Sequence, residues 1–242
     1  MLTAACMPWV PTSARRRRVG RFPDPRSAPV DGPLAWGGDL HVDTLVEAYG
    51  EGIFPWPAAD NGPLWWWSPD PRAVIPPGGL HISRSLRRTL RRSGLRCTSD
   101  RAFADVIAAC AHRPGEGTWI TRDMQQAYLR LYHHGTAHSV EVWRGADELV
   151  GGLYGVAVGR LFCGESMFHR IGDASKVAMV ATMRILECGG FVLFDVQLPT
   201  AHLASMGAVE ISRDVFLDLL RAHRDTRATW DPTAAHGDLL KA

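Results

Sequence analysis

An apolar segment, residues 191–198, carries two polar side chains. It reads Phe-Val-Leu-Phe-Asp-Val-Gln-Leu, and the alternation of side chains along a strand places Asp195 and Gln197 on one face. The opposite face is wholly apolar and consists of Val192, Phe194, Val196 and Leu198. A carboxylate in such surroundings loses hydration that only a partner charge or several hydrogen bonds replace. We therefore expect Asp195 and Gln197 to belong to a functional site.

A second strand-like segment, residues 161–168, has the same unusual feature. In an extended chain Glu165 shares a face with the apolar residues Leu161, Cys163 and Met167. Two interpretations are open. Either the two carboxylates and the amide form a built site, or Asp195 and Glu165 are structural carboxylates whose charges are met by backbone donors or arginines.

The order of predicted elements indicates an α+β (α/β) fold. Segments 139–144, 149–158 and 161–168 read as a meander of strands joined by glycine-rich turns. An apolar helix then runs to Gly189 and Gly190, and the strand that carries Asp195 follows at once. Such an order predicts a mostly antiparallel sheet with helices packed on it.

Polar residues mark the starts of the predicted helices. Caps are expected at Ser83, Ser99, Thr121, Asp173 and Ser212. His133 and His134 are expected to be ordinary residues at the C-terminal end of the helix that Thr121 begins. The last helix is expected to end near Leu220.

The chain divides into four parts by composition. Residues 1–28 contain several prolines and a run of four arginines, Arg15 to Arg18, and predict a mobile extension, either a solvated tail or a basic arm that contacts RNA. Residues 29–72, rich in tryptophan, proline and glycine, predict a small, loop-rich N-terminal domain. Residues 73–220 form the predicted main domain, and residues 221–242 a poorly ordered tail.

The composition excludes several classes of protein. With 46% hydrophobic and 21% charged residues among 242, the chain has a globular composition, and it contains no apolar run of the roughly 20 residues that span a bilayer. The five cysteines form no C-x-x-C pair. The arginine run comes after a short apolar stretch, whereas in a secretory signal the positive charges come before a longer apolar stretch. We expect a cytoplasmic protein. The histidines and cysteines show no zinc-ligand spacing, so we expect no metal.

One predicted helix has a strongly basic surface. Ile82, Leu86 and Leu90 lie along one side, and the rest is occupied by Arg84, Arg87, Arg88, Arg91 and Arg92. Basic and acidic residues nearly cancel over the chain, 27 against 25, so any contact with nucleic acid must come from such a local cluster. The helix is either a platform for RNA phosphates or a solvated face.

Ten short motifs occur in order along the chain: Gly37–Leu40, Gly52–Trp56, Trp66–Arg72, His81–Ser85, Gly117–Thr121, His138–Trp143, Gly151–Gly155, Gly164–Phe168, Asp173–Lys176 and His202–Gly207. One of them, residues 66–72, reads Trp-Trp-Ser-Pro-Asp-Pro-Arg. Taken together, the ten resemble the leucyl/phenylalanyl-tRNA-protein transferases, and the resemblance runs from about Phe22 to Leu220.

The resemblance implies a function and a fold. These bacterial aminoacyltransferases move Leu or Phe, with Met as a further candidate, from aminoacyl-tRNA to a protein whose first residue is Arg or Lys. The product is marked for degradation by the N-end rule. The family also implies an N-acetyltransferase-like C-terminal domain. We find no coenzyme A turn before Asp173, which agrees with a tRNA donor, and we expect no cofactor.

The resemblance also implies roles for individual residues. In the family's relay the carboxylate corresponding to Asp195 polarises the amide corresponding to Gln197, which contacts the acceptor amine. Asp195 acts either as a base or only as an orienter. Glu165 either pairs with the Arg or Lys of the acceptor or holds Gln197 in place. The donor side-chain pocket maps onto Trp56, Trp119, Leu153, Met167 and Phe194.

Some details of this mapping stay open. Leu153 and Phe194 depart from the family's commoner Met and Ile, so the order of preference among donor side chains is not set. The arginine helix maps onto the tRNA surface, and contact with roughly four phosphates predicts that log affinity falls with log salt by a slope near 3. Lys176 either contacts a phosphate or forms a structural ion pair.

Two other functions would fit the residues without the resemblance. The first is an acyl-CoA N-acyltransferase of the same fold, which would bind coenzyme A and ignore tRNA. The second is a non-catalytic RNA-binding protein, whose function would survive the loss of Asp195.

Overall fold

A computed structural model describes residues 22–30, 32–57, 62–112 and 118–236. The helices are η1 (Pro25–Ser27), α1 (Val42–Gly50), α2 (Arg84–Arg92), α3 (Phe103–Ala111), α4 (Arg122–His133), α5 (Ala174–Gly189), α6 (Ala201–Ser205), α7 (Arg213–His223) and η2 (Pro232–Ala235). The strands are β1 (Ala35–Trp36), β2 (Phe54–Pro57), β3 (Leu64–Trp67), β4 (Arg72–Ile75), β5 (Arg96–Ser99), β6 (Ala137–Arg144), β7 (Glu148–Val158), β8 (Leu161–His169), β9 (Leu193–Gln197) and β10 (Val209–Ile211).

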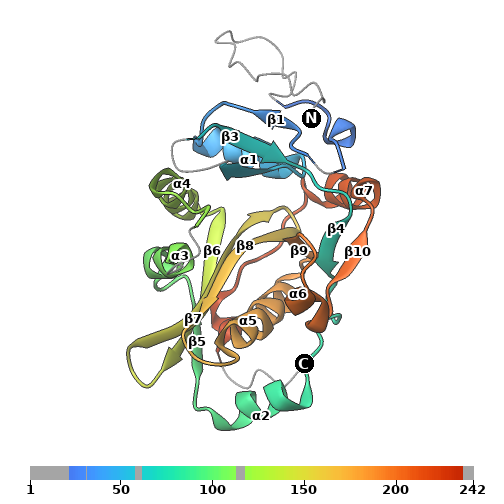
Figure 1. The fold of residues 1–242 in the computed structure, drawn as a ribbon. Helices are drawn as coiled ribbons and strands as arrows, with labels where there is room; N and C mark the ends of the chain where they lie inside the picture. The colour runs from blue at the N-terminus through green and yellow to red at the C-terminus, as the bar shows by residue number, and fades with distance from the viewer. Residues whose placement is uncertain (1–21, 31, 58–61, 113–117, 237–242) are drawn as a thin grey trace.

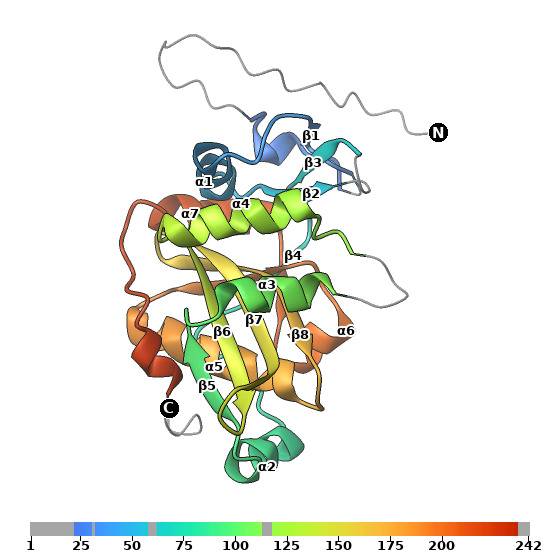
Figure 2. The same cartoon turned by 90° about the vertical axis from the view of Figure 1, so that its left-hand side faces the viewer.

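Seven strands form the central sheet in the order β10-β4-β9-β8-β7-β6-β5. Every neighbouring pair is antiparallel except β8 and β9, which run parallel and are connected through α5. Helices α3 and α4 cover one face of this sheet and α5 covers the other (Figures 1 and 2). The expected α+β class with a mostly antiparallel sheet is confirmed, and the meander is β6, β7 and β8. The likeness to N-acetyltransferases stays a prediction.

A second, small sheet has the order β1-β3-β2. Together with α1 it lies at one end of the central sheet, and α2 lies at the opposite end (Figures 1 and 2). Trp66 of β3 is fully buried and donates from Nε1 to the Gly37 carbonyl oxygen at 2.8 Å. The small sheet falls within the predicted domain 29–72, and the division of the chain into domains stays a prediction.

Two hydrophobic clusters line the two faces of the central sheet. The first, here the α3/α4 cluster, joins residues of α1, α3 and α4 to one side of β7 and β8, including Tyr49, Tyr128 and Cys163. The second, the α5 cluster, joins α5 to the other side and includes Leu153 and Phe194. No helix within the described residues is long and apolar enough to cross a membrane.

Three of the five expected helix caps are confirmed. The hydroxyls of Ser83, Thr121 and Ser212 each accept a hydrogen bond from the backbone N–H three residues on. Helix α4 ends at His133 and His134 follows as its C-cap, as expected.

Ser99 and Asp173 do not act as side-chain caps, so these two expectations are wrong. Ser99 ends β5 and donates to the Ser139 carbonyl oxygen at 2.8 Å, while α3 begins only at Phe103. Asp173 precedes α5 in a left-handed conformation, with φ of 65°, and its carboxylate turns to Lys176 Nζ at 2.9 Å instead. Lys176 therefore has the structural ion pair that was one of its two expected roles.

Near both ends of the described part of the chain, residues that were expected to be disordered are packed on the rest of the molecule. Phe22 packs edge-on against Trp66 at 4.7 Å between ring centroids, and Arg26 forms ion pairs with Asp214 and Asp218 of α7. Residues 22–28 are thus packed on the molecule, whereas the arginine run, residues 15–18, lies outside the described residues. Helix α7 continues to His223, past the expected end near Leu220.

The segment after α7 also packs against the sheet. Trp230 stacks on His138 at 4.4 Å and donates from Nε1 to Ser99 Oγ at 2.9 Å. Ala235 of η2 is buried in the α5 cluster. The prediction of a poorly ordered tail is therefore wrong for residues 221–236, because an aromatic side chain and a short 3-10 helix fix this segment.

Candidate active site

A β-bulge in β8 sets the direction of Glu165. Tyr154 of β7 pairs with Ser166 and Gly155 pairs with Gly164, which leaves Glu165 as an extra residue on β8. Bulges of this kind redirect a side chain and often lie beside active sites. As a result Cys163 packs in the α3/α4 cluster and Met167 in the α5 cluster. The expectation that Glu165 shares one face with both residues is wrong, because the bulge interrupts the alternation.

A second bulge shapes the end of β9. Asp195 pairs with Val74 and Gln197 with the adjacent Ala73, so Val196 is the extra residue. Gln197 has φ of 65°, and the Leu198 N–H donates to the Val196 carbonyl oxygen at 2.9 Å, closing a three-residue turn. A side chain in this region of φ costs about 1–3 kcal/mol. Asp195 and Gln197 therefore meet through a turn and not through the regular alternation expected from the sequence.

Asp195 is neutralised by Arg72, which the sequence analysis did not assign to the site. The guanidinium donates from Nε to Oδ1 at 2.8 Å and from Nη2 to Oδ2 at 2.6 Å, with both side chains almost completely buried. Burial by itself lowers the pKa of Arg72, but the charge of Asp195 outweighs it and the pKa is raised. Asp195 Oδ1 also accepts the Gln197 backbone N–H at 3.0 Å. The expected alternative, a carboxylate satisfied by an arginine and a backbone donor, describes these contacts of Asp195.

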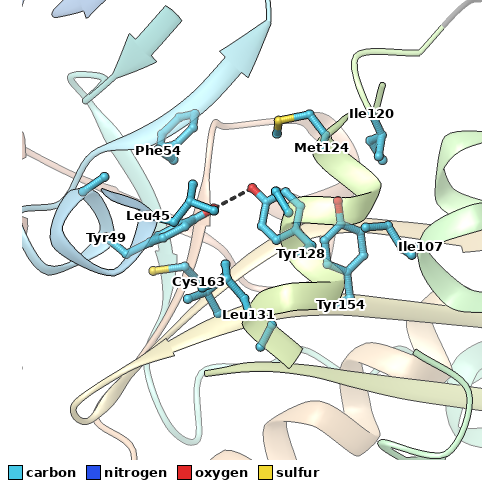
Figure 3. Packing of buried hydrophobic residues seen from close by; sticks show 14 of the residues in the cluster. Leu45, Tyr49, Phe54, Ile107, Ile120, Met124, Tyr128, Leu131, Tyr154 and Cys163 are labelled. Atoms are coloured by element: carbon cyan, nitrogen blue, oxygen red, sulfur yellow. Dashed lines mark hydrogen bonds between the residues drawn. The ribbon is translucent and has the colours of Figure 1, made fainter. Parts of the chain in front are cut away.

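Glu165 lies at the centre of a network of neutral donors. It accepts from Tyr128 Oη at 2.7 Å and from Gln197 Nε2 at 2.7 Å. Tyr128 Oη is in turn 2.6 Å from Tyr49 Oη, and Figure 3 shows these two hydroxyls pointing toward each other from α4 and α1. The carboxylate that contacts the amide of Gln197 is thus Glu165, and not Asp195 as the resemblance implied.

Burial controls the charge state of this network. It raises the pKa of Glu165 to about 7, although the hydrogen bond from Tyr128 lowers it. Burial and the nearby charge of Glu165 raise the pKa of Tyr49 and of Tyr128 well above the usual value for tyrosine. Both tyrosines therefore stay neutral near pH 7, while Glu165 is poised between its two protonation states.

The five predicted donor-pocket residues fall into two groups. Trp56 and Trp119 are half-buried neighbours with ring centroids 5.5 Å apart, and both pack on the α3/α4 cluster. Leu153, Met167 and Phe194 belong to the α5 cluster, where Leu153 and Met167 are partners across β7 and β8. A single pocket formed by all five stays a prediction.

The five arginines of α2 are all exposed, whereas Leu86 is buried in the α5 cluster. The apolar back and cationic front expected for this helix are therefore present. The helix lies at the end of the molecule away from the small sheet (Figure 1). Whether it binds tRNA stays a prediction.

Sequence reasoning missed three residues of the network: Arg72, Tyr49 and Tyr128. Arg72 closes the motif of residues 66–72, and this position was the available signal. Tyr128 shares one side of its helix with the apolar residues Met124 and Leu131, so its spacing indicates packing only, and nothing in the sequence marks Tyr49. No group of three or more His, Cys, Asp or Glu side chains in the described part of the chain could hold a metal ion.

A buried carboxylate with a raised pKa, held by a carboxamide and a tyrosine hydroxyl, marks this network as a candidate active site of an α+β protein. A family model described as leucyl/phenylalanyl-tRNA protein transferase matches residues 74–221, and the model of that family's N-terminal domain matches residues 38–70. The chain belongs to the leucyl/phenylalanyl-tRNA protein transferase family, which confirms the resemblance inferred from the ten motifs, and it is a transferase enzyme.

Individual relatives are similar over most of their length. The leucyl/phenylalanyl-tRNA–protein transferase of Shewanella pealeana is 51% identical over 214 residues, which cover 87% of this chain and 90% of that protein. The corresponding protein of Anaeromyxobacter sp. (strain K) is 52% identical over 222 residues, which cover 90% of this chain and 92% of that protein. Among solved structures, that of L-PGS from Bacillus licheniformis aligns with a TM-score of 0.41 at 11% identity, covering 67% of this chain and 52% of that one, too weakly to support an argument.

Proposed function

We propose that this chain transfers Leu or Phe, with Met as a further donor, from aminoacyl-tRNA to proteins that begin with Arg or Lys. The product would carry a signal for degradation by the N-end rule in the cytoplasm. The observation that supports this proposal most is membership of the family, over residues 38–70 and 74–221. The network around Gln197 supplies a mechanism for it.

The reaction needs positioning and proton transfer. The amine nitrogen of the acceptor attacks the ester carbonyl carbon of the aminoacyl-tRNA. A peptide bond forms, the bond from the carbonyl carbon to the ribose oxygen breaks, and the amine proton ends on the released ribose hydroxyl. Because the ester is already activated, no covalent enzyme intermediate is required. The amine, with an ordinary pKa of about 7.7–8.0, reacts only in its neutral form.

Gln197 is the proposed direct contact with that amine. Its Nε2 donates to Glu165 at 2.7 Å, which leaves the amide oxygen to accept a hydrogen bond from the amine. Glu165 thereby sets the direction of the amide. Both Asp195 oxygens accept hydrogen bonds from Arg72, so the version in which Asp195 orients the site is favoured over the version in which it is the base.

Glu165 has two proposed roles, and the contacts favour one of them. Its two oxygens already accept hydrogen bonds from Tyr128 and from Gln197, which supports a role in holding Gln197 over pairing with the acceptor's side chain. Replacing Glu165 by Gln separates the two. Equal losses of activity with peptides that start with Arg and with Ala are expected if Glu165 holds Gln197, whereas a loss confined to the Arg peptide would assign it to acceptor selectivity.

The donor side chain is proposed to pack against the Trp56–Trp119 pair, with Leu153, Met167 and Phe194 as further proposed residues of its pocket. Large aromatic surfaces bind an apolar side chain without discriminating finely among similar ones. The arginines of α2 are proposed to meet tRNA phosphates, which provides affinity that does not depend on sequence.

The test is transfer of labelled Leu from charged tRNA to an Arg-starting peptide by the purified chain. We expect transfer by the wild type and a large loss of turnover in Asp195→Asn with little loss of tRNA affinity. Since one partner of a buried ion pair is removed, that variant must first be checked for folding. Absence of transfer by the wild type would reject the proposal. Binding of coenzyme A without tRNA would then favour the acyl-CoA enzyme, and tRNA binding without transfer the RNA-binding protein.

A further inference from the structure

Arg72 contacts elements on both sides of the proposed site. We infer that Arg72 is a positioning residue, which fixes the strand that carries Gln197 relative to the strand that carries Trp56 and so sets the distance between acceptor amine and donor ester. The inference rests on the proposed function. It concerns a residue that would touch neither substrate.

On the acceptor side, Arg72 acts through Asp195. Its two parallel hydrogen bonds, at 2.8 and 2.6 Å, fix both carboxylate oxygens. Asp195 in turn accepts the backbone N–H of Gln197 at 3.0 Å, inside the turn where Gln197 has φ of 65°. The backbone conformation that aims the Gln197 amide at Glu165 therefore depends on the orientation of Asp195, and that orientation depends on the guanidinium.

On the donor side, the same guanidinium holds the start of β2. Its Nη1 donates to the Gly52 carbonyl oxygen at 3.3 Å, and its carbon lies 4.9 Å from the centroid of the Phe54 ring. The Phe54 ring is 6.4 Å from that of Trp56, which lies 5.5 Å from Trp119. Through these contacts one planar group sets the position of the tryptophan pair.

The chemistry of this position requires arginine. The guanidinium carbon lies over the rings of Phe54 and Phe216, 4.9 and 4.3 Å from their centroids, while its nitrogens donate to Asp195 and to Gly52. A lysine ammonium would keep the charge but lose the planar fork and the stacking. A buried ion pair is often no more stabilising than apolar side chains of similar size, so stability alone does not explain why one is placed here.

Arg72→Lys is the first test. We expect kcat for Leu transfer to fall by about a hundredfold, as for a misplacement of about 1 Å, while the affinity for uncharged tRNA stays within about twofold. The matched control is Arg213→Lys. Arg213 is also buried, but its Nη1 donates to the carbonyl oxygen of Ser68 and lies outside the network, so kcat is expected to stay close to the wild-type value.

Chemical rescue separates positioning from simple stabilisation. In Arg72→Ala, added guanidinium, at concentrations far below those that unfold proteins, is expected to restore at least about tenfold in kcat, and methylammonium much less. Folded Arg72→Lys with kcat within about threefold of wild type, or equal rescue by both cations, would overturn the inference.

A readout without catalysis keeps this test separate from the proposed function. The NMR signals of the Gln197 side-chain amide, assigned by their absence in Gln197→Glu, are expected to shift in Arg72→Lys and to stay unchanged in Arg213→Lys. If the wild type transfers no amino acid but these shifts appear, the proposed function fails, and only the positioning of Gln197 by Arg72 stands. If the wild type is active and the amide signals do not respond to Arg72→Lys, the positioning role fails.

Discussion

Glu165 accepts a hydrogen bond at 2.7 Å from the side-chain amide of Gln197, a residue 32 positions further along the chain. The parallel register of β8 and β9 brings the two segments together, because Cys163 pairs with Asp195, and Glu165 and Gln197 each follow two residues further along. A bulge in each strand then turns both side chains into one buried network. Parallel pairing and two bulges together therefore bring the amide to the carboxylate.

The first prediction concerns the pH dependence of stability. The pKa of Glu165 is raised from 4.5 to about 7 in the folded protein, so between these values the folded state keeps a proton that the unfolded chain has released. The stability due to this proton is complete below about pH 4.5 and is lost as the pH rises through about 7. Glu165→Gln does not titrate, so its free energy of unfolding should rise relative to wild type by about 1.4 kcal/mol per pH unit across this interval.

Denaturant unfolding of both proteins at a series of pH values measures this difference. Glu148→Gln is the control. The side chain of Glu148 is exposed, and its hydrogen bond with Arg144 lowers the pKa of Glu148. The stability that its charge contributes is therefore lost only when the pH falls below the ordinary pKa of glutamate. The difference in free energy of unfolding between Glu148→Gln and wild type should thus stay constant from about pH 5 to 8. A flat difference for Glu165→Gln as well would show that Glu165 ionises normally.

The second prediction concerns the arginines of α2. Replacing Arg87 and Arg91 together by Gln should lower tRNA affinity and reduce the slope of log affinity against log salt by about 1.5, since a slope near 3 for roughly four phosphates corresponds to about 0.75 for each contact. The rate of transfer at saturating tRNA should not change, because α2 lies at the end of the molecule opposite the small sheet and α1 (Figure 2). Titrations at several salt concentrations measure the slope. Arg221→Gln, an exposed arginine of α7, serves as the control, and equal slopes in all three proteins would remove α2 from the tRNA surface.

The third prediction concerns the tryptophan pair. Trp119→Ala should raise KM for leucyl-tRNA at least about tenfold, because even one methylene in an apolar pocket is worth about 1–3 kcal/mol. Affinity for uncharged tRNA should stay the same, as the lost contacts are with the amino acid. Trp36→Ala removes half of another half-buried pair, Trp36 and Trp65 at 6.5 Å, and should leave KM unchanged. An equal rise in KM for both variants would argue against a donor pocket at Trp119.

The fourth prediction concerns the bulge at Glu165. A Cβ at Gly155, which pairs with Gly164 beside the bulge, would overlap the Cys163 carbonyl oxygen and lie 2.6 Å from Phe162 Cζ. Gly155→Ala should therefore destabilise the protein by about 1–3 kcal/mol and lower transfer activity at temperatures where it stays folded. Thermal unfolding and the transfer assay measure the two effects. Gly172→Ala meets nothing within 4 Å and should change neither, whereas an active, fully stable Gly155→Ala would show that the bulge tolerates repacking.

Local pattern was sufficient to predict the fold class and several of its elements. The caps at Ser83, Thr121 and Ser212, and the three strands of the meander, depend on residues a few positions apart, and they were read correctly from spacing alone. The caps expected at Ser99 and Asp173 were wrong because other groups compete for each side chain. Ser99 bonds to Ser139, and the Asp173 carboxylate accepts from Lys176 of α5 and from Thr89 of α2. A short-range rule does not include such competing partners.

The site was only partly predictable. Glu165, Asp195 and Gln197 were found because polar side chains in apolar strands are unfavourable without partners, and that cost is visible in the sequence. The partners were not visible. Arg72 lies 123 positions from Asp195 and Tyr128 lies 37 positions from Glu165, so only packing brings them together.

The sequence by itself determined the main helices, the strands of the meander and the strand that carries Asp195, which family the chain resembles, and that three polar residues lie in apolar strands. The tertiary structure decided which carboxylate contacts the Gln197 amide, which one is neutralised by an arginine, and which one keeps a pKa of about 7. The physical reason is that periodicity and capping act over a few residues. Bulge register, burial and charge pairing instead depend on groups that the folded chain brings together from distant positions.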